Sequence, residues 1–274
     1  MTKKVATIIL NRNLPEVTDN LVNHLKEHDG NYTDIFVIEA GSDITNLSKN
    51  TTWHIKDEFT IAHGLRYPRG VNIGIKNLYN ENKFAQYESF FFVTNDTILE
   101  KKQTIEPLQK IFNEHSKLGI ISPCSKEWGE YILLQEEKIK YFWFIHSHAY
   151  FIRKEFIEGL CNLDDNYISL LFDGSNFRGW GLETELIAKG YANNWASAIT
   201  SHVTVEENNS YLIEKSDLIK TEGFNENLEL YITEGKEWMR KKYGFKSKWD
   251  LIFYAKSFYD GFFKKNQSLK KYKI

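Results

Sequence analysis

Short apolar runs of strand length alternate along the chain with segments whose apolar residues recur at helical spacing. Val5 to Leu10, Ile35 to Ile38 and Phe90 to Val93 are continuous apolar runs. Between the first two runs, helical spacing is seen at Val17, Leu21, Val22 and Leu25. This order predicts a strand, a helix and a second strand. Its repetition favours an α/β protein with a mostly parallel, Rossmann-like central sheet flanked by helices.

The same patterns predict the remaining elements and divide the chain in two. Helices are expected over residues 70–79, 104–117 and 180–189, and strands over 119–122, 141–145, 149–152 and 195–200. Beyond His202 the chain becomes polar and then helical, over residues 225–242 and 248–263. We therefore expect a main α/β domain over residues 1–205 and a C-terminal helical extension over residues 206–274.

The C-terminal extension is basic and aromatic. From Lys241 to Ile274 it has ten lysines against Asp250 and Asp260, so this stretch carries +8 and the rest of the chain about −10. Such a composition is typical of segments that lie on an anionic membrane surface. It fits equally well a solvated basic face whose aromatic side chains pack back on the main domain. Nucleic-acid binding requires a continuous basic face, and the acidic remainder of the chain argues against one.

The N-terminal residues and the cysteines favour the cytoplasm. Met1 to Lys4 leads directly into an apolar strand, without the apolar segment and cleavage site of a secretory signal. Cys124 and Cys161 lie far apart and outside any Cys-x-x-Cys spacing, which indicates core residues rather than a disulfide framework or a thiolate zinc site. We expect a cytoplasmic protein, either free or peripheral on the inner face of a membrane.

Polar residues at the ends of the expected strands indicate a candidate site. In open parallel sheets, ligands bind beyond the carboxyl ends of the strands. Asn11 and Glu39 each follow such a strand, and Asp96 follows the run that ends at Val93. A carboxylate at this edge suits a magnesium or manganese ion that bridges to a diphosphate. The other interpretation is that Asn95 and Asp96 only form a turn.

Two arginines and two glycines lie close to the same edge. Arg66 and Arg69 precede a helix whose Gly70 and Gly74 permit close packing on the sheet. The forked guanidinium group suits a diphosphate. Exposed arginines are also commonly just solvated, so the sequence leaves both interpretations open.

Two glutamates follow the segment Gly179-Trp180-Gly181. Glu183 and Glu185 fall in the first turn of an expected helix, where the helix dipole keeps a carboxylate ionised, as a general base requires. We favour Glu183 as the base because Leu182 and Leu186 form an apolar pair that should face the core, and Glu185 is the competitor. Alternatively, both acids only stabilise the helix, which would leave the Gly-Trp-Gly segment unexplained.

Taken together, these segments resemble the family-2 type of inverting glycosyltransferases with the GT-A fold. Thr94-Asn95-Asp96-Thr97 is similar to the strand-end metal motif of that family, commonly Asn-Asn-Asp-Thr, with the first position changed. Val5 to Asn13 resembles the first strand of the family with its Asn-Arg turn. Phe36 to Asp43 is similar to the family segment Val-Asp-Asn-Gly-Ser-x-Asp, and Gly64 to Gly74 is similar to its glycine-rich stretch ending in Asn-x-Gly. The resemblance covers residues 5–203 and includes the Trp180 segment.

The resemblance implies a role for each matching residue. Donor-binding residues would be Asn11, Arg12, Glu39, Gly41, Arg69, Asn72, Thr94 and Asn95. Glu39 would accept a hydrogen bond from the base, in place of the family's Asp. Asp96 would contact the metal, and His202, after the last expected strand, would complete the metal site. Glu183 or Glu185 would be the catalytic base. Alignment on Trp180-Gly181 puts Thr184 where the family commonly has an Asp, whereas alignment on the end of the motif puts Glu183 there. His146 and His148 have no assigned role.

The function implied is metal-dependent glycosyl transfer with inversion, of the kind used in polysaccharide biosynthesis. The domain over residues 1–205 would bind a nucleoside-diphosphate sugar, with a UDP- or dTDP-sugar favoured, and a manganese or magnesium ion. The acceptor would be a hydroxyl of a saccharide or of a lipid-linked saccharide. The alternative is a noncatalytic nucleotide-sugar- or glycan-binding module with a degenerate GT-A fold, which Thr94 and Thr184 favour.

Overall fold

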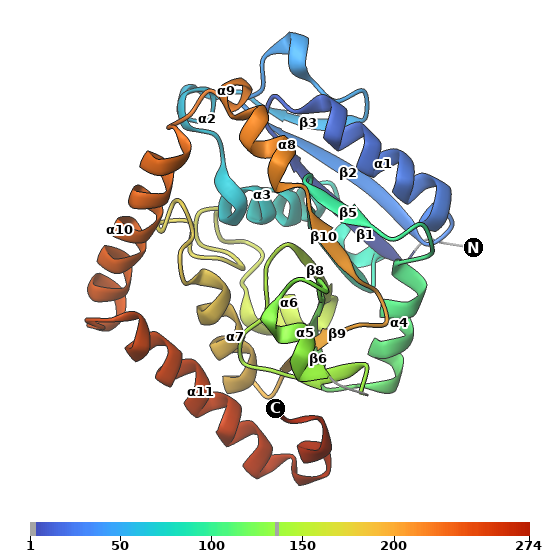
Figure 1. Cartoon of the computed structure of the whole chain (residues 1–274), viewed down its shortest axis with the longest axis vertical. Coiled ribbons are helices and arrows are strands. Elements are labelled where there is room, and N and C mark those ends of the chain that lie inside the picture. The colour runs from blue at the N-terminus through green and yellow to red at the C-terminus, as the bar shows by residue number, and fades with distance from the viewer. Residues whose placement is uncertain (1–3, 135–136) are drawn as a thin grey trace.

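The computed structural model describes residues 4–134 and 137–274, and a large mostly parallel sheet lies at the centre of this part of the chain (Figure 1). Its strand order is β3-β2-β1-β4-β8-β6-β9-β7. The strands are β1 (Val5–Asn11), β2 (Thr33–Ala40), β3 (Thr51–Ile55), β4 (Ser89–Thr94), β6 (Leu118–Pro123), β7 (Ile139–Tyr141), β8 (Ala149–Arg153) and β9 (Ala196–Thr200). A small antiparallel sheet pairs β5 (Thr97–Leu99) with β10 (Val205–Glu207).

Strand directions set which ends meet at the same edge. β1, β2, β3 and β4 are parallel to one another, and β6 is parallel to β9. β8 lies between β4 and β6 and is antiparallel to both, so its amino end meets the carboxyl end of β4. The predicted α/β class is confirmed. The strand predicted over 141–145 was wrong beyond Tyr141, because the chain there leaves the sheet and Ile145 lines a cavity instead.

Helices connect the strands and cover the sheet. They are α1 (Pro15–Asp29), α2 (Glu58–His63), α3 (Arg66–Asn80), α4 (Ile105–Glu114), α5 (Gly129–Leu134), α6 (Lys154–Leu160), α7 (Leu182–Ala192), α8 (Asn209–Glu214), α9 (Ser216–Ile219), α10 (Phe224–Tyr243) and α11 (Lys248–Lys265), with short 3₁₀ turns η1 (Ile44–Asn46), η2 (Phe84–Gln86) and η3 (Gln267–Tyr272). In Figure 1, α1 and α3 lie on either side of β1 and β2. Gly74 allows α3 to approach closely, since a Cβ there would lie 2.9 Å from Ile8.

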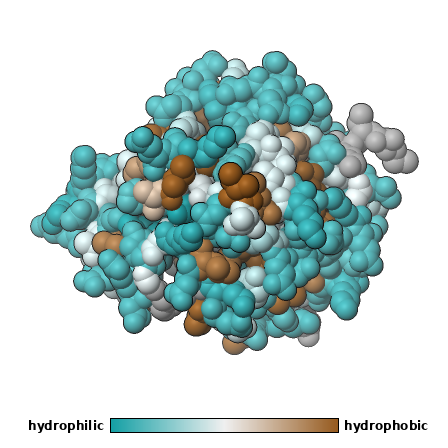
Figure 2. Space-filling model, turned by 90° about the horizontal axis from the view of Figure 1, so that it is seen from above, coloured by the Kyte–Doolittle hydropathy of each residue, from teal (hydrophilic) through white to brown (hydrophobic). Residues whose placement is uncertain are grey.

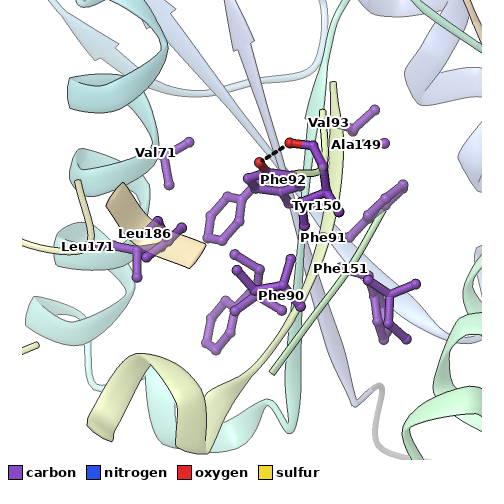
Figure 3. Close-up of a cluster of buried hydrophobic side chains, with 14 of the residues drawn as sticks. Val71, Phe90, Phe91, Phe92, Val93, Ala149, Tyr150, Phe151, Leu171 and Leu186 are labelled. Carbon is purple, nitrogen blue, oxygen red and sulfur yellow. Dashed lines mark hydrogen bonds between the residues drawn. The ribbon is translucent and has the colours of Figure 1, made fainter. Parts of the chain in front are cut away.

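Strand β4 is buried on both faces, which explains its continuous apolar sequence. Phe90 and Phe92 point to one face and stack with their ring centroids 6.3 Å apart, whereas Phe91 points to the other face and contacts Phe151 of β8 (Figure 3). Burial of each such ring contributes about 1.5–3 kcal/mol. The strand that ends at the candidate metal motif is therefore held rigidly on both sides.

The C-terminal helices pack on the main domain and then return to its sheet. α11 packs against α7, where Tyr191 contacts Tyr259 at 5.3 Å between ring centroids. After η3, Tyr272 stacks on Tyr141 of β7 at 5.2 Å. Much of the aromatic tail therefore packs back on the domain, which was one of the two interpretations of its composition. Trp249 differs, because 65% of its surface remains exposed.

The surface is mostly polar. Figure 2 shows one face of the molecule, on which apolar side chains form small, separate groups within a hydrophilic surround. Within the part of the chain that the structure describes, no helix is both long enough and apolar enough to cross a bilayer.

Candidate functional site

The carboxyl ends of β1, β2 and β4 meet at one edge of the sheet, and Asn11 lies at their junction. Its side-chain amide donates to Glu39 at 2.8 Å. Its carbonyl oxygen accepts hydrogen bonds from Thr18 at 2.9 Å and from Asn95 at 3.3 Å. Asn11, Glu39 and Asn95, three of the residues predicted to bind the donor, are therefore joined in one network. In this network they stabilise the edge itself.

Glu39 is completely buried and fully occupied by protein donors. Besides Asn11, its carboxylate accepts hydrogen bonds from the Ser42 hydroxyl at 2.6 Å, the Ser48 N–H at 2.8 Å and the Thr51 hydroxyl at 3.0 Å. Four donors satisfy both of its oxygens, which is what a buried carboxylate requires. A hydrogen bond from a nucleobase would have to displace one of them.

Arg12 fastens the ends of several segments together. Its guanidinium donates to the carbonyl oxygens of Ala40, of Thr60 in α2 and of Ile219 in α9. Gly41 permits this arrangement, because its backbone has a φ of 73° and a Cβ would lie 2.2 Å from the Thr60 carbonyl oxygen. The structure thus shows Arg12 and Gly41 as residues that shape the rim.

Arg69 and Asn72 of α3 hold the loop that leads to α7. Arg69 donates through Nε to the Gly174 carbonyl at 2.9 Å and lies over the ring of Phe177 at 4.7 Å. The buried Asn72 amide donates to the Phe172 carbonyl at 2.8 Å and accepts from the Phe172 N–H at 3.0 Å. The contact of Arg69 with a diphosphate and the place of Asn72 in the nucleotide pocket remain predictions, whereas the contacts of both residues with this loop are direct.

The strand-end motif presents one carboxylate with few partners. Asp96 follows β4 and is only 9% exposed, yet no described residue donates a hydrogen bond to its carboxylate. His148 lies beside it, with Nε2 3.9 Å from the Asp96 carboxylate and Nδ1 3.9 Å from that of Glu207. Thr94 completes the group, because its hydroxyl is 3.3 Å from His148 Nδ1. Oxygen donors of this kind suit a hard divalent cation whose other ligands come from phosphate and water.

His202 was predicted to complete the metal site, but the structure places it in other surroundings. It is exposed and its charged neighbours are Lys138, Glu114 and Lys110, and none of the described contacts joins it to Asp96. Partial desolvation of the ring and the nearby lysines lower the pKa of His202. Across residues 4–134 and 137–274, no three His, Cys, Asp or Glu side chains gather as a complete metal site.

The segment Gly179-Trp180-Gly181 turns the chain into α7. Gly179 and Gly181 have φ values of 91° and 86°, in the left-handed region that favours glycine. Trp180 is covered by α10, which approaches so closely that a Cβ on Gly235 would lie 2.5 Å from its ring. This turn fixes the first residues of α7 and thereby the directions of Glu183 and Glu185.

Glu183 points into the cleft at the carboxyl edge. Its carboxylate accepts a hydrogen bond from the Ser147 hydroxyl at 2.9 Å. Burial raises the pKa of Glu183 above its usual 4.5, while hydrogen bonds from its own N–H and from Ser147 act in the opposite direction. A carboxyl group with a raised pKa in a cleft is suited to accept a proton near neutral pH.

Glu185, two residues further on, points the other way. It is 1% exposed and is bound by three groups: the Tyr243 hydroxyl, Lys242 at 2.7 Å and Lys189 at 3.3 Å. Lys242 also binds Asp173. Glu185 is therefore part of the contact between α7 and α10, and its oxygens are not available in the cleft.

Three adjoining cavities form the cleft, and we name them by position. The strand-end cavity, of about 120 Å³, includes Leu10, Tyr67, Gly70, Thr94 and Asn95 in its lining. The middle cavity, of about 230 Å³, shares Tyr67 and Thr94 with it and adds Ser147, His148, Arg178 and Glu183. The outer cavity, of about 250 Å³, shares Ser147, Glu183 and Tyr231 with the middle one and adds Phe144, His146, Trp180 and Lys248. The shared lining joins the three cavities, and Glu183 lines two of them. Asp96 lies beside the cleft, 3.9 Å from His148 of the middle cavity.

Several residues of the cleft were not predicted from the sequence. Ser147 and His148 belong to a His-Ser-His segment that was noticed but had no assigned partner. Tyr231 comes from α10, which carries no sequence signal for this role. Tyr67 lines two cavities, and its buried hydroxyl has no partner among the described residues. Burial raises its pKa well above 10, so the hydroxyl stays protonated and can donate a hydrogen bond.

Comparison with known proteins identifies the fold. No protein-family model and no curated protein sequence matches the chain. S. aureus TarS 1-349 in complex with UDP has a TM-score of 0.53 at 14% identity, over 87% of this chain and 73% of that one. The same protein in complex with UDP-GlcNAc has a TM-score of 0.51 at 15% identity, over 87% and 74%. GalNAc-T7 with UDP, GalNAc and Mn²⁺ has a TM-score of 0.55 at 11% identity, over 75% of this chain but only 44% of its own. The chain has the fold of the GT-A glycosyltransferases.

Proposed function

We propose that this protein is a metal-dependent, inverting glycosyltransferase of the family-2 type that uses a nucleoside-diphosphate sugar. The observation that carries the proposal is the continuous cleft with a sparsely bonded Asp96 near one end and Glu183, with its raised pKa, toward the other. Similar folds solved with UDP, UDP-GlcNAc and Mn²⁺ support a nucleotide donor and a divalent cation.

In this proposal, the strand-end motif holds the diphosphate side of the donor. Asp96 binds a manganese or magnesium ion, and Thr94 and Asn95 line the adjoining space. When bound, the ion neutralises charge on the departing diphosphate. His148 replaces His202 as the imidazole next to the ion, because it lies 3.9 Å from the Asp96 carboxylate. The buried Tyr67 hydroxyl has no hydrogen-bond acceptor among the described residues, and a phosphate or sugar oxygen in the cleft would supply one.

Glu183 serves the acceptor side. It removes the proton from an acceptor hydroxyl as that hydroxyl attacks the anomeric carbon from the face opposite the diphosphate. Inversion follows because a single displacement occurs. The occupied state of Glu185 supports Glu183 as the base. Trp180 and Tyr231, in the lining of the outer cavity, offer aromatic surfaces against which the rings of a saccharide or lipid-linked saccharide can pack.

A donor screen tests the proposal. UDP-, dTDP- and GDP-sugars are compared in a thermal-shift assay with and without manganese, and sugar transfer or donor hydrolysis is measured in parallel. We expect a UDP- or dTDP-sugar to raise the melting temperature only with the cation, because a ligand that binds the native state stabilises it. Binding without turnover would identify a noncatalytic module instead, and the absence of any cation-dependent binding would refute the proposal.

A further inference from the structure

Helix α11 has one buried face and one exposed face of unusual composition. Tyr259 and Leu251 lie on the buried face, toward α7. The exposed face, which we call the α11 face, consists of Trp249, Phe253, Lys256, Ser257, Asp260 and Lys264, and Lys248 and Lys265 flank it at the two ends of the helix. Trp249 and Phe253 are one helical turn apart, 65% and 64% exposed, and their ring centroids are 6.3 Å apart. From this face we infer that α11 docks the protein on an anionic lipid surface.

The aromatic pair is the apolar half of the α11 face. Two large rings side by side on the surface leave apolar area in contact with water, which costs free energy in a free monomer. Tryptophan and other aromatic side chains are favoured at the boundary between water and lipid, where the ring lies among the headgroups. In this protein the pair lies on a helix that the main domain already holds firmly from behind, so the aromatic rings need no refolding to reach a surface.

The lysines supply the charge that selects an anionic surface. Among the described residues, no carboxylate pairs with Lys248, Lys264 or Lys265. Lys256 is paired with Asp260, which Lys273 also binds. The other acid of the helix, Asp250, accepts hydrogen bonds from backbone N–H groups before α11. The face is therefore positive, whereas residues 1–240 carry about −10, so an anionic surface attracts this end of the molecule and repels the rest.

The α11 face borders the mouth of the outer cavity. Lys248 and Ile252 of α11 line that cavity and lie next to Trp249 and Phe253 in the helix. His146, which also lines this cavity, pairs with Glu130 of α5. Docking would place this opening at the lipid surface, whatever reaction the cleft performs.

The composition of the face favours lipid over a glycan. A surface that binds a saccharide by stacking also needs carboxylates or amides to accept hydrogen bonds from the sugar hydroxyls. The α11 face offers mainly aromatic rings and lysine ammonium groups, which donate only, because the Asp260 carboxylate is already bound by Lys256 and Lys273. Phosphate groups of anionic lipids match such donors directly.

Vesicle sedimentation of the full chain tests this inference. We expect binding to vesicles of phosphatidylcholine mixed with an equal amount of phosphatidylglycerol, little binding to phosphatidylcholine alone, and loss of binding at high salt, which screens exposed charges. The double substitution Trp249→Ala and Phe253→Ala should weaken binding about tenfold or more. Lys264→Glu with Lys265→Glu should weaken it by a similar factor.

Matched controls separate docking from loss of structure. Ile44 and Ile98 are also exposed apolar residues, at 84% and 46%, but lie outside the α11 face, so Ile44→Ala with Ile98→Ala should bind vesicles as the natural chain does. Each variant is checked for an unchanged melting temperature. Failure of the natural chain to sediment, or equal binding by the aromatic variant, would overturn the inference. So would binding to a soluble polysaccharide instead of vesicles, if the aromatic variant loses it.

Discussion

Polar side chains at two parts of the same sheet edge differ in how many hydrogen-bond partners the protein gives them. In the first, around β1 and β2, Glu39 has four donors and Arg12 has carbonyl acceptors from five different residues. In the second, the cleft, the Tyr67 hydroxyl has no described partner and no described residue donates to the Asp96 carboxylate. Glu183 has one side-chain donor, Ser147.

The number of hydrogen-bond partners within the protein distinguishes residues that support the structure of a site from residues that are free to bind a ligand. A buried polar group without a partner costs about 1–3 kcal/mol, so a fold tolerates it only where something else supplies the partner. The β1 and β2 part of the edge is complete without a ligand, and we interpret it as a scaffold. The cleft is incomplete, and in the proposed function its open positions are those that donor and acceptor would fill. Each of the following changes tests one side of this distinction.

The largest effect should come from Glu183→Gln. Glutamine keeps the shape of the side chain but cannot remove the proton from the hydroxyl of the acceptor substrate. We therefore expect the rate of transfer to fall by about 10³-fold or more, within the usual contribution of a general base. The measurement is kcat/KM for the acceptor at saturating donor. Glu185→Gln is the control on the same helix. It should keep transfer within about tenfold while lowering stability, because it leaves Lys242 without its buried partner. Equal losses of activity in both variants would contradict the assignment.

Stability should respond in the opposite order. Glu39→Gln should lower the free energy of unfolding by about 3 kcal/mol, because its amide nitrogen would face donors such as the Asn11 amide or the Ser48 N–H. Glu183→Gln should leave stability unchanged or higher at neutral pH, measured by urea unfolding. The raised pKa means that the native state holds this proton more tightly than the unfolded state, so stability falls as the pH rises through the window above 4.5. The advantage of Glu183→Gln should disappear below that window, and a stabilising Glu39→Gln would break the distinction.

Asp96→Asn should remove the dependence on the cation. We expect the manganese-dependent rise in melting temperature with the nucleotide sugar to vanish and transfer to fall by about 10²-fold, because the amide is a poor ligand for a hard cation. His202→Ala is the matched control and should keep both properties, since His202 has its charged neighbours elsewhere. A normal cation response in Asp96→Asn would place the cation at other residues.

Ser147→Ala should have the smallest effect and a specific one. The Ser147 hydroxyl donates to the ionised carboxylate of Glu183, so its loss should raise the pKa of Glu183 further. Because the base works in its ionised form, the acid limb of the rate–pH profile should move to higher pH while the plateau changes little. Ser257→Ala, on the exposed side of α11, should leave the profile in place. A lowered plateau without a shifted limb would argue that Ser147 acts on the substrate instead.

Sequence patterns were sufficient to predict the strand ends and insufficient to predict their neighbours. The apolar runs correctly placed Asn11, Glu39 and Asp96 at or just beyond the ends of β1, β2 and β4. His202 was expected near Asp96 because the family resemblance implied it, but β8 and β6 separate β9 from β4. His148 lies there instead, because β8 runs antiparallel to β4 and begins at the edge where β4 ends. Strand order and direction depend on contacts between distant segments, which a single sequence does not reveal.

The two glutamates show the same limit on a smaller scale. Helical spacing correctly directed Leu182 and Leu186 into the core. The partners that hold Glu185, Lys242 and Tyr243, come from a helix more than fifty residues later, and no local pattern could predict them. The aromatic tail is a similar case, since packing against α7 selected which of its rings would be covered.

The opposite orientations of Glu183 and Glu185 join the C-terminal tail mechanically to the cleft. One helical turn carries both a side chain that faces the cleft and a side chain that is fastened to α10. A displacement of α10 would therefore move Glu185 and, only two residues away in the same helical turn, Glu183. Replacing the C-terminal helices with those of another protein would disturb the position of the Glu183 carboxylate. We therefore expect that α7 and the C-terminal helices have to be exchanged together in an engineered protein.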